Sequence, residues 1–189
     1  MTTFSEQLAK RRSIRDFEER EVPLSLVREI IDEACLAPSA RNDQPWHFII
    51  INNRDVIRRL SDESKRNILD EIDKDPASSL ARYEGALRNE EFNVFWNAPC
   101  LVYIAGPGDV TSLQVDCALA AAWFMFSAAS RGLGTCWIGL GSHIRDPETK
   151  TLIGLPEHFR IVAPIVLGYP RTIPKAPPRK PPSILAVIG

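Results

Sequence analysis

Apolar residues recur along the chain at two spacings, and each spacing predicts one kind of element. Val27, Ile30, Ile31 and Ala34 lie three or four residues apart, which predicts a helix over residues 22–37. A short run of Phe and Ile at 48–51 is typical of a buried strand, here over 46–51. The same criteria predict helices over 4–11, 54–73, 111–131 and 147–153, strands over 100–105 and 161–167, and a strand or extended segment over 134–140. Residues 74–97 are polar and are expected to be helical only in part.

Two of the predicted helices carry signals at their ends. Thr3 and Glu6 have the spacing of a capping box before the first helix, whose Leu8 is expected to face the core. Gly132 follows the 111–131 helix and is expected to end it. That helix is apolar almost all round in its middle, which predicts a central position in the fold.

Length and composition favour one ordinary domain, over residues 1–170. The chain has 189 residues, enough for one sizeable core, and a formal net charge of -1, which gives no support for a nucleic-acid partner. The most apolar stretch, 117–129, is too short to cross a bilayer, and the N-terminus lacks the pattern of a secretory signal. We therefore expect a cytoplasmic protein that does not contact a membrane.

Cysteine and histidine positions give no sign of a metal site or a disulfide. Cys35, Cys100, Cys117 and Cys136 form no C-x-x-C pair and sit in apolar surroundings, so free, buried thiols are expected. No spacing typical of metal ligands joins them to the three histidines.

The composition changes after residue 170. Prolines at 170, 174, 177, 178, 181 and 182 exclude a helix or a central strand. The tail nevertheless ends in the apolar residues 184–188, which a disordered terminus does not need. We expect residues 171–189 to form an extended arm that packs on a partner subunit.

A cluster of arginines follows the first predicted helix, where residues 11–15 read Arg-Arg-Ser-Ile-Arg. A guanidinium group offers a planar fork of donors that suits phosphate. In an extended segment Arg11, Ser13 and Arg15 point to the same side, so one side can present phosphate and polar-ring contacts together. The alternative is a solvated basic face, or ion pairs with the acidic side chains of residues 16, 18 and 19.

Two further segments suit a flat heterocycle. Residues 38–46 read Pro-Ser-Ala-Arg-Asn-Asp-Gln-Pro-Trp, and the amides of Asn42 and Gln44 both donate and accept; the alternative is an ordinary polar turn. Residues 132–141 read Gly-Leu-Gly-Thr-Cys-Trp-Ile-Gly-Leu-Gly, and such glycines let the backbone approach a ligand. Their spacing is not a G-x-G-x-x-G dinucleotide fingerprint, and the alternative is a helix cap followed by a strand bend.

Taken in order, these segments resemble the nitroreductase family. The order is RRSIR, then PSARNDQPWHF, then GLGTCWIG after an alanine-rich helix, then LGYP and a PPRKPP tail, so the resemblance covers residues 4–182. It implies an α+β fold, a three-layer sandwich whose central, mostly antiparallel sheet is flanked by helices. It also implies a homodimer that exchanges C-terminal arms and binds flavin mononucleotide (FMN) at the subunit interface.

The resemblance assigns cofactor-binding residues by position. Arg11, Arg12, Ser13 and Arg15 match the first FMN segment of the family. Arg11 and Arg12 are expected at the phosphate or ribityl end of FMN. Arg15 is expected near the pyrimidine edge of the ring, where a cation stabilises the reduced flavin.

Three other segments complete the implied site. The loop that reaches the flavin of the other subunit is matched by Ser39, Asn42 and Gln44. The segment along the reactive part of the ring is matched by Trp137, Ile138 and Gly139, and a basic position that closes on the phosphate is matched by Arg179. The chain departs from larger relatives, which carry Pro-Ile-Glu-Gly where this chain has Trp-Ile-Gly-Leu. It also has no clear counterpart of their middle-region Asn and Lys, for which the candidates are Lys65, Arg66, Asn67 and Asn89.

The resemblance implies an oxidoreductase that uses NADH or NADPH to reduce nitroaromatics, quinones or related small acceptors by a ping-pong mechanism. No Ser-His-Asp or Cys-His arrangement can be assigned, so we expect FMN to carry the chemistry. Alternatives on the same fold are a dehydrogenase, a reductive dehalogenase or a flavin-consuming enzyme. A non-catalytic flavin-binding protein is a further alternative.

Overall fold

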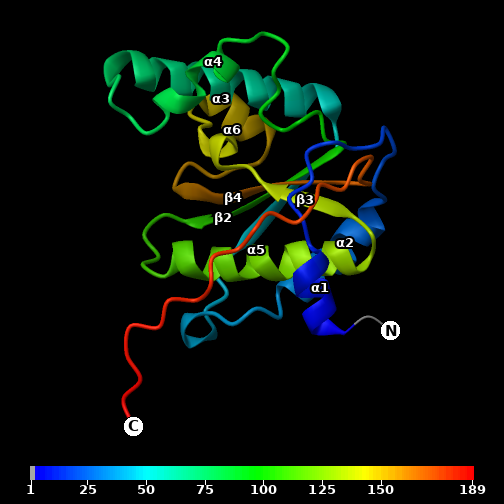
Figure 1. Ribbon diagram of the computed structural model, residues 1–189. Helices are drawn as coiled ribbons and strands as arrows, with labels where there is room; N and C mark the ends of the chain where they lie inside the picture. The colour runs from blue at the N-terminus through cyan, green and yellow to red at the C-terminus, as the bar shows by residue number, and fades with distance from the viewer. Residues whose placement is uncertain (1–2) are drawn as a thin grey trace.

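One four-stranded sheet lies at the centre of the structure, a computed structural model that describes residues 3–189 (Figure 1). Its strands are β1 (His47–Ile51), β2 (Cys100–Pro107), β3 (Gly134–Trp137) and β4 (Phe159–Gly168). They lie in the order β1-β2-β4-β3, and each neighbouring pair is antiparallel. The predicted antiparallel sheet is confirmed, and β3 is one of its edges.

Helices cover both faces of this sheet (Figure 1). One layer contains α3 (Arg54–Lys74), α4 (Glu84–Leu87) and α6 (Pro147–Leu152). The other contains α1 (Phe4–Lys10), α2 (Leu24–Ala34) and α5 (Leu113–Ser130). Short 3-10 turns span Ala40–Asn42, Ala81–Tyr83 and Gly139–Ser142. The predicted α+β three-layer sandwich is confirmed.

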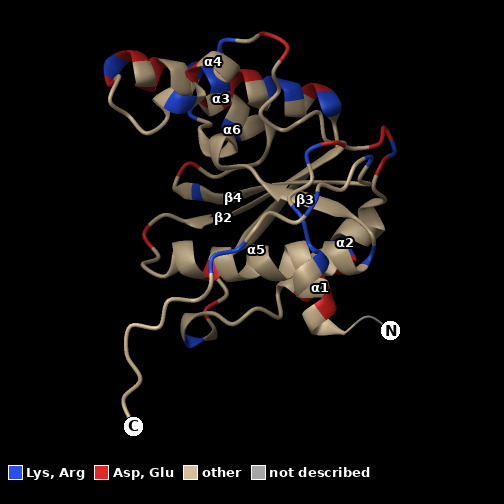
Figure 2. Cartoon of the chain, viewed as in Figure 1, with Lys and Arg blue, Asp and Glu red and all other residues tan. Residues whose placement is uncertain are grey.

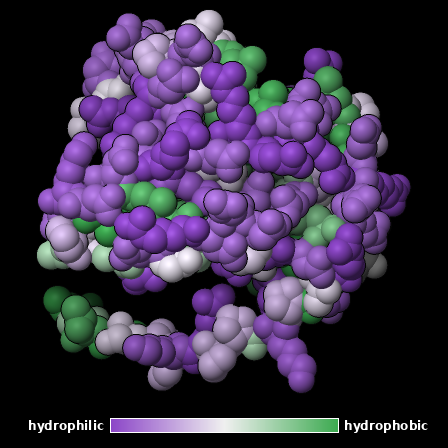
Figure 3. Space-filling view, turned by 90° about the horizontal axis from the view of Figure 1, so that it is seen from above, coloured by the Kyte–Doolittle hydropathy of each residue, from purple (hydrophilic) through white to green (hydrophobic). Residues whose placement is uncertain are grey.

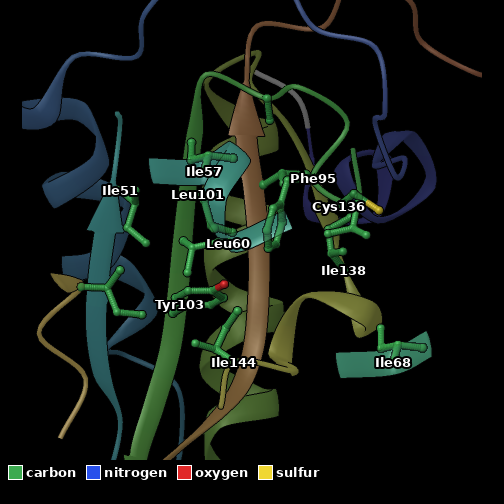
Figure 4. Close-up of a cluster of buried hydrophobic side chains, with 14 of the residues drawn as sticks. Ile51, Ile57, Leu60, Ile68, Phe95, Leu101, Tyr103, Cys136, Ile138 and Ile144 are labelled. Carbon is green, nitrogen blue, oxygen red and sulfur yellow. The ribbon is translucent and has the colours of Figure 1, made fainter. Parts of the chain in front are cut away.

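The strand β2 shows why the sheet is central. Alternate side chains enter opposite cores: Leu101, Tyr103 and Ala105 face the α3 layer, and Cys100, Val102 and Ile104 face the α5 layer. A strand covered on both faces is apolar throughout, and this is why its sequence is a continuous apolar run. Figure 4 shows the core on the α3 side, which Cys136 and Ile138 join from β3 and the residue after it.

The long helix predicted over 111–131 is observed as α5, Leu113–Ser130. With 18 residues it is, among residues 3–189, the one helix long and apolar enough to cross a membrane. Its inner face packs against the sheet through residues such as Cys117, Ala120 and Phe124. Its outer face leaves Val115 62% and Trp123 41% exposed. As predicted, Gly132 ends the segment with φ 74°, and Leu133 N donates to the carbonyl of residue 128 (3.0 Å).

The first helix is placed differently from the prediction. The capping box is present: Thr3 N donates to the Glu6 carboxylate (2.8 Å), and Glu6 N donates to the Thr3 hydroxyl (3.3 Å). The expectation that Leu8 faces the core was wrong, because Leu8 is 46% exposed and α1 has no buried residue. The reason is that α1 lies on α5 rather than on the sheet, with Phe4 against Phe126.

Residues 171–189 form neither helix nor strand, and all of them are exposed. In Figure 3 the end of this tail stands apart from the body, with its apolar residues in green. Leu185 and Ile188 are 97% and 94% exposed in this single chain. That the tail packs on a partner subunit stays a prediction.

Candidate functional site

Two extended segments run side by side at the edge of the sheet. Ile14 N donates to Thr135 O (2.9 Å), and Ser13 forms a parallel bridge with Thr135. Residues 11–15 therefore run along the outer edge of β3 in the same direction. Figure 2 shows the basic character of this segment, between α1 and β3.

A basic cavity lies at the first end of these two segments. It has a volume of about 220 Å³ and is lined by Lys10, Arg11, Arg12 and residues 132–135. No Asp or Glu is among its lining residues. A concave site with cations and no competing carboxylate suits an anionic group such as a phosphate.

The two neighbouring arginines of this cavity differ in their contacts. Arg12 donates from one terminal nitrogen to the carbonyls of Ala9 (2.6 Å) and Arg11 (2.7 Å), so it caps the C-terminal end of α1. Among residues 3–189, the Arg11 side chain has no hydrogen-bond partner. Asp16 pairs with Arg171 (3.5 Å), and among residues 3–189 no ion pair joins residues 16, 18 or 19 to the arginines of this segment.

An aromatic cavity of about 690 Å³ lies at the other end of the two segments. One wall carries the apolar and aromatic side chains of Leu80, Tyr83, Phe92, Val94 and Trp96, and the other wall is residues 136–140. Arg15 and Arg82 are the only charged residues that line it. Its size and apolar lining are typical of a site for a flat organic ligand.

Arg15 reaches this cavity with its side chain exposed and close to an aromatic ring. Its guanidinium carbon lies 5.7 Å from the centre of the Trp96 ring. Burial raises the pKa of the Cys136 thiol, and the nearby Arg15 guanidinium and Ser13 hydroxyl act in the opposite direction. A thiol with a raised pKa stays protonated at neutral pH, so Cys136 is not expected to act as a nucleophile. All four cysteines are free as predicted, although Cys35 is only partly buried.

The wall made by residues 136–140 offers backbone rather than side chains. Cys136 and Ile138 point into the core on the α3 side (Figure 4), and Trp137 packs with the core on the α5 side. At Gly139 an added Cβ would meet no atom within 4 Å. The segment therefore leaves open space beside Gly139 for a ligand.

Buried polar side chains of α3 hold the turn that follows β3. Glu63 is 3% exposed, and its carboxylate accepts from the backbone N–H groups of residues 145 and 146 (2.7 and 2.9 Å). The Ser64 hydroxyl donates to the Leu140 carbonyl, and Asn67 donates to the carbonyl of residue 143 (2.7 Å). The bond from Ser64 holds Leu140, which lines the aromatic cavity, and the other bonds hold the residues that follow the turn.

Lys65 holds the opposite wall. Its ammonium group donates to the carbonyls of Asn89 (2.7 Å) and Phe92 (3.0 Å), at the start of the segment that carries Trp96. Lys65 and Asn67 were candidates for the middle-region flavin contacts of the family, but their polar groups are bonded to the protein backbone. Asn89 lies near Arg15 in a separate polar cavity.

The loop with Ser39, Asn42 and Gln44 is held in a strained conformation. Arg41, Asn42 and Gln44 have φ values of 51°, 61° and 46°, which are unusual for residues other than glycine. The strain is supported by hydrogen bonds from Gln44 N to the Ser39 hydroxyl (3.1 Å) and from Gln44 Nε2 to Asn42 Oδ1 (3.1 Å). These hydrogen bonds therefore hold the loop in its positive-φ conformation.

This loop lies away from the basic cavity of its own chain. Ala40 N donates to the buried carboxylate of Asp116 (3.0 Å), near the start of α5, whereas Ser130 at the end of α5 lines the basic cavity. At a rise of 1.5 Å per residue these two positions of the helix are about 21 Å apart. Arg179 lies in the exposed tail and lines neither cavity. One chain thus brings together two groups: Arg11 with Arg12, and Arg15 with residues 137–139.

In a comparison with known proteins, the sequence profile of the nitroreductase family matches residues 8–169. The chain belongs to the nitroreductase family. Its members are FMN-dependent oxidoreductases.

This member of the nitroreductase family has relatives with different names. A protein of Methanothermobacter thermautotrophicus, provisionally named an NADH dehydrogenase/NAD(P)H nitroreductase, is 29% identical over 170 residues, which cover 89% of this chain and 78% of that protein. Iodotyrosine deiodinase 1 of Sus scrofa is 26% identical, over 94% of this chain and 65% of that protein. A crystal structure of a nitroreductase with bound FMN from Bacteroides fragilis has a TM-score of 0.84 at 24% identity, covering 99% of this chain and 100% of that one, which shows a shared fold.

Sequence reasoning missed the second wall of the aromatic cavity in this nitroreductase-family chain. Tyr83, Phe92 and Trp96 come from the polar stretch that predicted no clear element. The available signal was the presence of large aromatic residues in a segment otherwise rich in polar ones. Trp96 and Asn97 also have positive φ values (57° and 51°), which no local sequence pattern indicated.

Proposed function

We propose that the chain is an FMN-dependent oxidoreductase that takes electrons from NADH or NADPH and passes them to nitroaromatics, quinones or related small acceptors. The observation that carries this proposal is the pair of parallel segments, residues 11–15 and β3, which join a basic cavity to an aromatic one. FMN has the matching shape, a phosphate at one end and a flat ring at the other. Enzymes of this class run on the redox chemistry of their cofactor.

The donor set fits FMN at both ends. Arg11, with no other partner among residues 3–189, would bind the phosphate, and Lys10 and the remaining donors of Arg12 would support it. The open space beside Gly139 would accept the ring. Once bound, FMN supplies reversible transfer of two electrons between a nicotinamide and an acceptor.

Arg15 has the electrostatic role in this proposal. Its guanidinium reaches the aromatic cavity, and no carboxylate within 4.0 Å neutralises it among residues 3–189. A fixed cation stabilises negative charge where that charge develops, so Arg15 would favour the reduced cofactor. For a quinone the balanced reaction is NAD(P)H + H⁺ + quinone → NAD(P)⁺ + hydroquinone, with the protons supplied by solvent. Donor and acceptor would use the same cavity in turn, which gives ping-pong kinetics.

A second copy of the chain completes the proposed site. The loop with Ser39, Asn42 and Gln44 is bonded near the start of α5, at the opposite end of that helix from the basic cavity, so we assign these residues to the cofactor held by the partner subunit. The exposed Val115 and Trp123 of α5 supply an apolar face for the contact. The tail would pack on the partner, and Arg179 would then approach the phosphate.

The most informative experiment is a visible spectrum of the purified protein, recorded without oxygen before and after adding NADH or NADPH. We expect a bound flavin that is bleached by at least one donor and restored by a quinone. Arg11→Gln should weaken FMN binding, and Arg15→Gln should lower the midpoint potential of the bound flavin. Arg58→Gln is the matched control, since Arg58 lies exposed on α3 and lines neither cavity. A protein that binds no FMN refutes the proposal.

Reductive dehalogenation is the second candidate, because iodotyrosine deiodinase 1 is among the relatives of this chain. Release of halide from a halogenated phenol by the reduced holoenzyme would favour it. Reduction of quinones and nitroaromatics without halide release would favour the first proposal. Bleaching by neither donor would favour a flavin-binding protein without turnover.

A further inference from the structure

The two arginines of the aromatic cavity stand among apolar and aromatic side chains and have no acidic partner there. Six other arginines in residues 3–189 form ion pairs with carboxylates: Arg41, Arg59, Arg88, Arg131, Arg145 and Arg171. Among the described residues, neither Arg15 nor Arg82 has a carboxylate within salt-bridge distance. No Asp or Glu lines the cavity either. The lining of the aromatic cavity therefore contains two positive charges and no negative one.

Arg82 is held in place although it is exposed. Its Nε donates to the Ser79 carbonyl (2.8 Å), and its guanidinium carbon lies 5.3 Å from the centre of the Tyr83 ring. These contacts leave the two terminal nitrogens without a hydrogen-bond partner among residues 3–189. The fork formed by those nitrogens is the geometry that binds a carboxylate through two hydrogen bonds. The next arginine, Arg88, shows the contrast, since Glu84 (2.9 Å) and Asp73 (3.0 Å) occupy its donors.

The position of Arg82 distinguishes it from the proposed cofactor contacts. Arg82 belongs to the 3-10 turn Ala81–Tyr83, on the wall formed by the segment before β2, whereas Arg15 lies beside β3. Apolar and aromatic side chains, among them Phe92 and Trp96, make up the rest of this wall. Such a wall accepts an aromatic ring, and the single cation on it accepts an anionic substituent of that ring.

We propose that Arg82 binds an anionic group of the electron acceptor, so that the cavity selects aromatic acceptors that carry a carboxylate or a similar anion. This inference rests on the proposed function. It adds a substrate class, anionic aromatic compounds, and a specificity-determining residue, Arg82. The same chemistry could be offered by the pyrophosphate of the nicotinamide donor, so the test separates the two sources.

The first measurement is equilibrium binding without turnover. Oxidised holoenzyme is titrated by calorimetry with benzoate and, separately, with benzamide, which has a similar shape and no charge. We expect benzoate to bind about tenfold more tightly, which corresponds to about 1.4 kcal/mol. The preference should fall as salt is raised, because the guanidinium is exposed. Arg82→Gln should remove the preference, Arg82→Lys should keep part of it, and the control Arg58→Gln should keep all of it.

The second measurement separates acceptor from donor. The kcat/KM ratio of 4-nitrobenzoate to 4-nitrobenzamide is compared between wild type and Arg82→Gln, so that the intrinsic reducibility of the two compounds cancels. We expect this ratio to fall about tenfold in the variant. Reduction of the flavin by NADH and by NADPH is measured alone in the same proteins. A variant slowed only in that half-reaction, with its acceptor ratio unchanged, overturns the inference and assigns Arg82 to the donor.

The outcomes distinguish this inference from the proposed function. A wild-type holoenzyme that binds benzoate and benzamide equally, yet oxidises NADH or NADPH with both nitro compounds, overturns the anion site and leaves the proposed function standing. A benzoate preference that survives in Arg82→Gln also overturns it. A protein without flavin overturns both.

Discussion

The contact between residues 11–15 and β3 can be tested by one added methyl group, in Gly134→Ala. A Cβ at this position would lie 2.6, 2.7 and 2.9 Å from three side-chain atoms of Ile14. Ile14 is 3% exposed and branched at Cβ, and its backbone is bonded to Thr135, so it cannot turn away. The segment must move by roughly 0.8 Å to restore ordinary contact, and overpacking of this kind costs about 1–3 kcal/mol.

The expected result has two parts. Thermal unfolding of the apoprotein should occur at a lower temperature, by roughly 2–4 °C for each kcal/mol lost. FMN should bind about tenfold more weakly, because Arg11 and Arg15 move with Ile14 and binding groups must be held within about 0.5 Å. Circular dichroism measures the first effect, and titration of flavin fluorescence measures the second.

Gly85→Ala is the matched control, because a Cβ there would meet no atom within 4 Å and the residue lies in α4. That change should leave FMN affinity as it is and stability unchanged or slightly higher. If Gly134→Ala unfolds at the wild-type temperature and binds FMN with wild-type affinity, residues 11–15 do not pack on β3 as described.

Three further predictions concern stability. Lys65→Met should lower the free energy of unfolding by about 2–4 kcal/mol, because it leaves the carbonyls of residues 89 and 92 without their donor, whereas the exposed Lys74→Met should change it little; urea unfolding measures both. Hydrogen bonds from Arg131 lower the pKa of Glu33 from 4.5 to about 2, so the contribution of this pair is complete above pH 4.5 and lost as the pH falls towards 2. The difference in urea midpoint between wild type and Glu33→Gln should therefore shrink over that range; a constant difference would contradict this assignment. Gly132→Ala should lower the free energy of unfolding by about 1–2 kcal/mol, because residue 132 has φ 74° and alanine is strained there. An unchanged melting temperature would contradict this prediction.

Local pattern located most of the elements. The spacing of Val27, Ile30 and Ala34 predicted α2, and the helix begins and ends within three residues of the prediction. The apolar runs predicted all four strands, since a strand between two helical layers is apolar on both faces. The predicted strand or extended segment over 134–140 ends early, because the chain enters a 3-10 turn at Gly139. That turn is held by Ser64 and Tyr103, which are distant in sequence.

Polar residues show the limit of sequence reasoning most clearly. Glu63 and Lys65 resemble an ordinary solvated helix face, yet they are 3% and 8% exposed and bind backbone groups of segments distant in sequence. Leu8 is apolar, which favours a place in the core, yet it is exposed because α1 lies on α5. Burial depends on which segment covers a residue, and no local pattern contains that information.

The sequence by itself determined the order of the elements, the family and the residues proposed to bind the cofactor. Periodicity, glycine positions and motif order can all be read along the chain without knowledge of its tertiary contacts. Only the tertiary structure determined which of those residues lie together at each cavity. Arg15 lies at the aromatic cavity and Arg11 at the basic cavity. The loop that contains Asn42 is bonded near the start of α5, away from the basic cavity. The tertiary structure also brought Arg82 to the cavity wall opposite residues 136–140, more than fifty positions further along the chain. Contacts over such separations form only when the sheet and its two helical layers close around a common core.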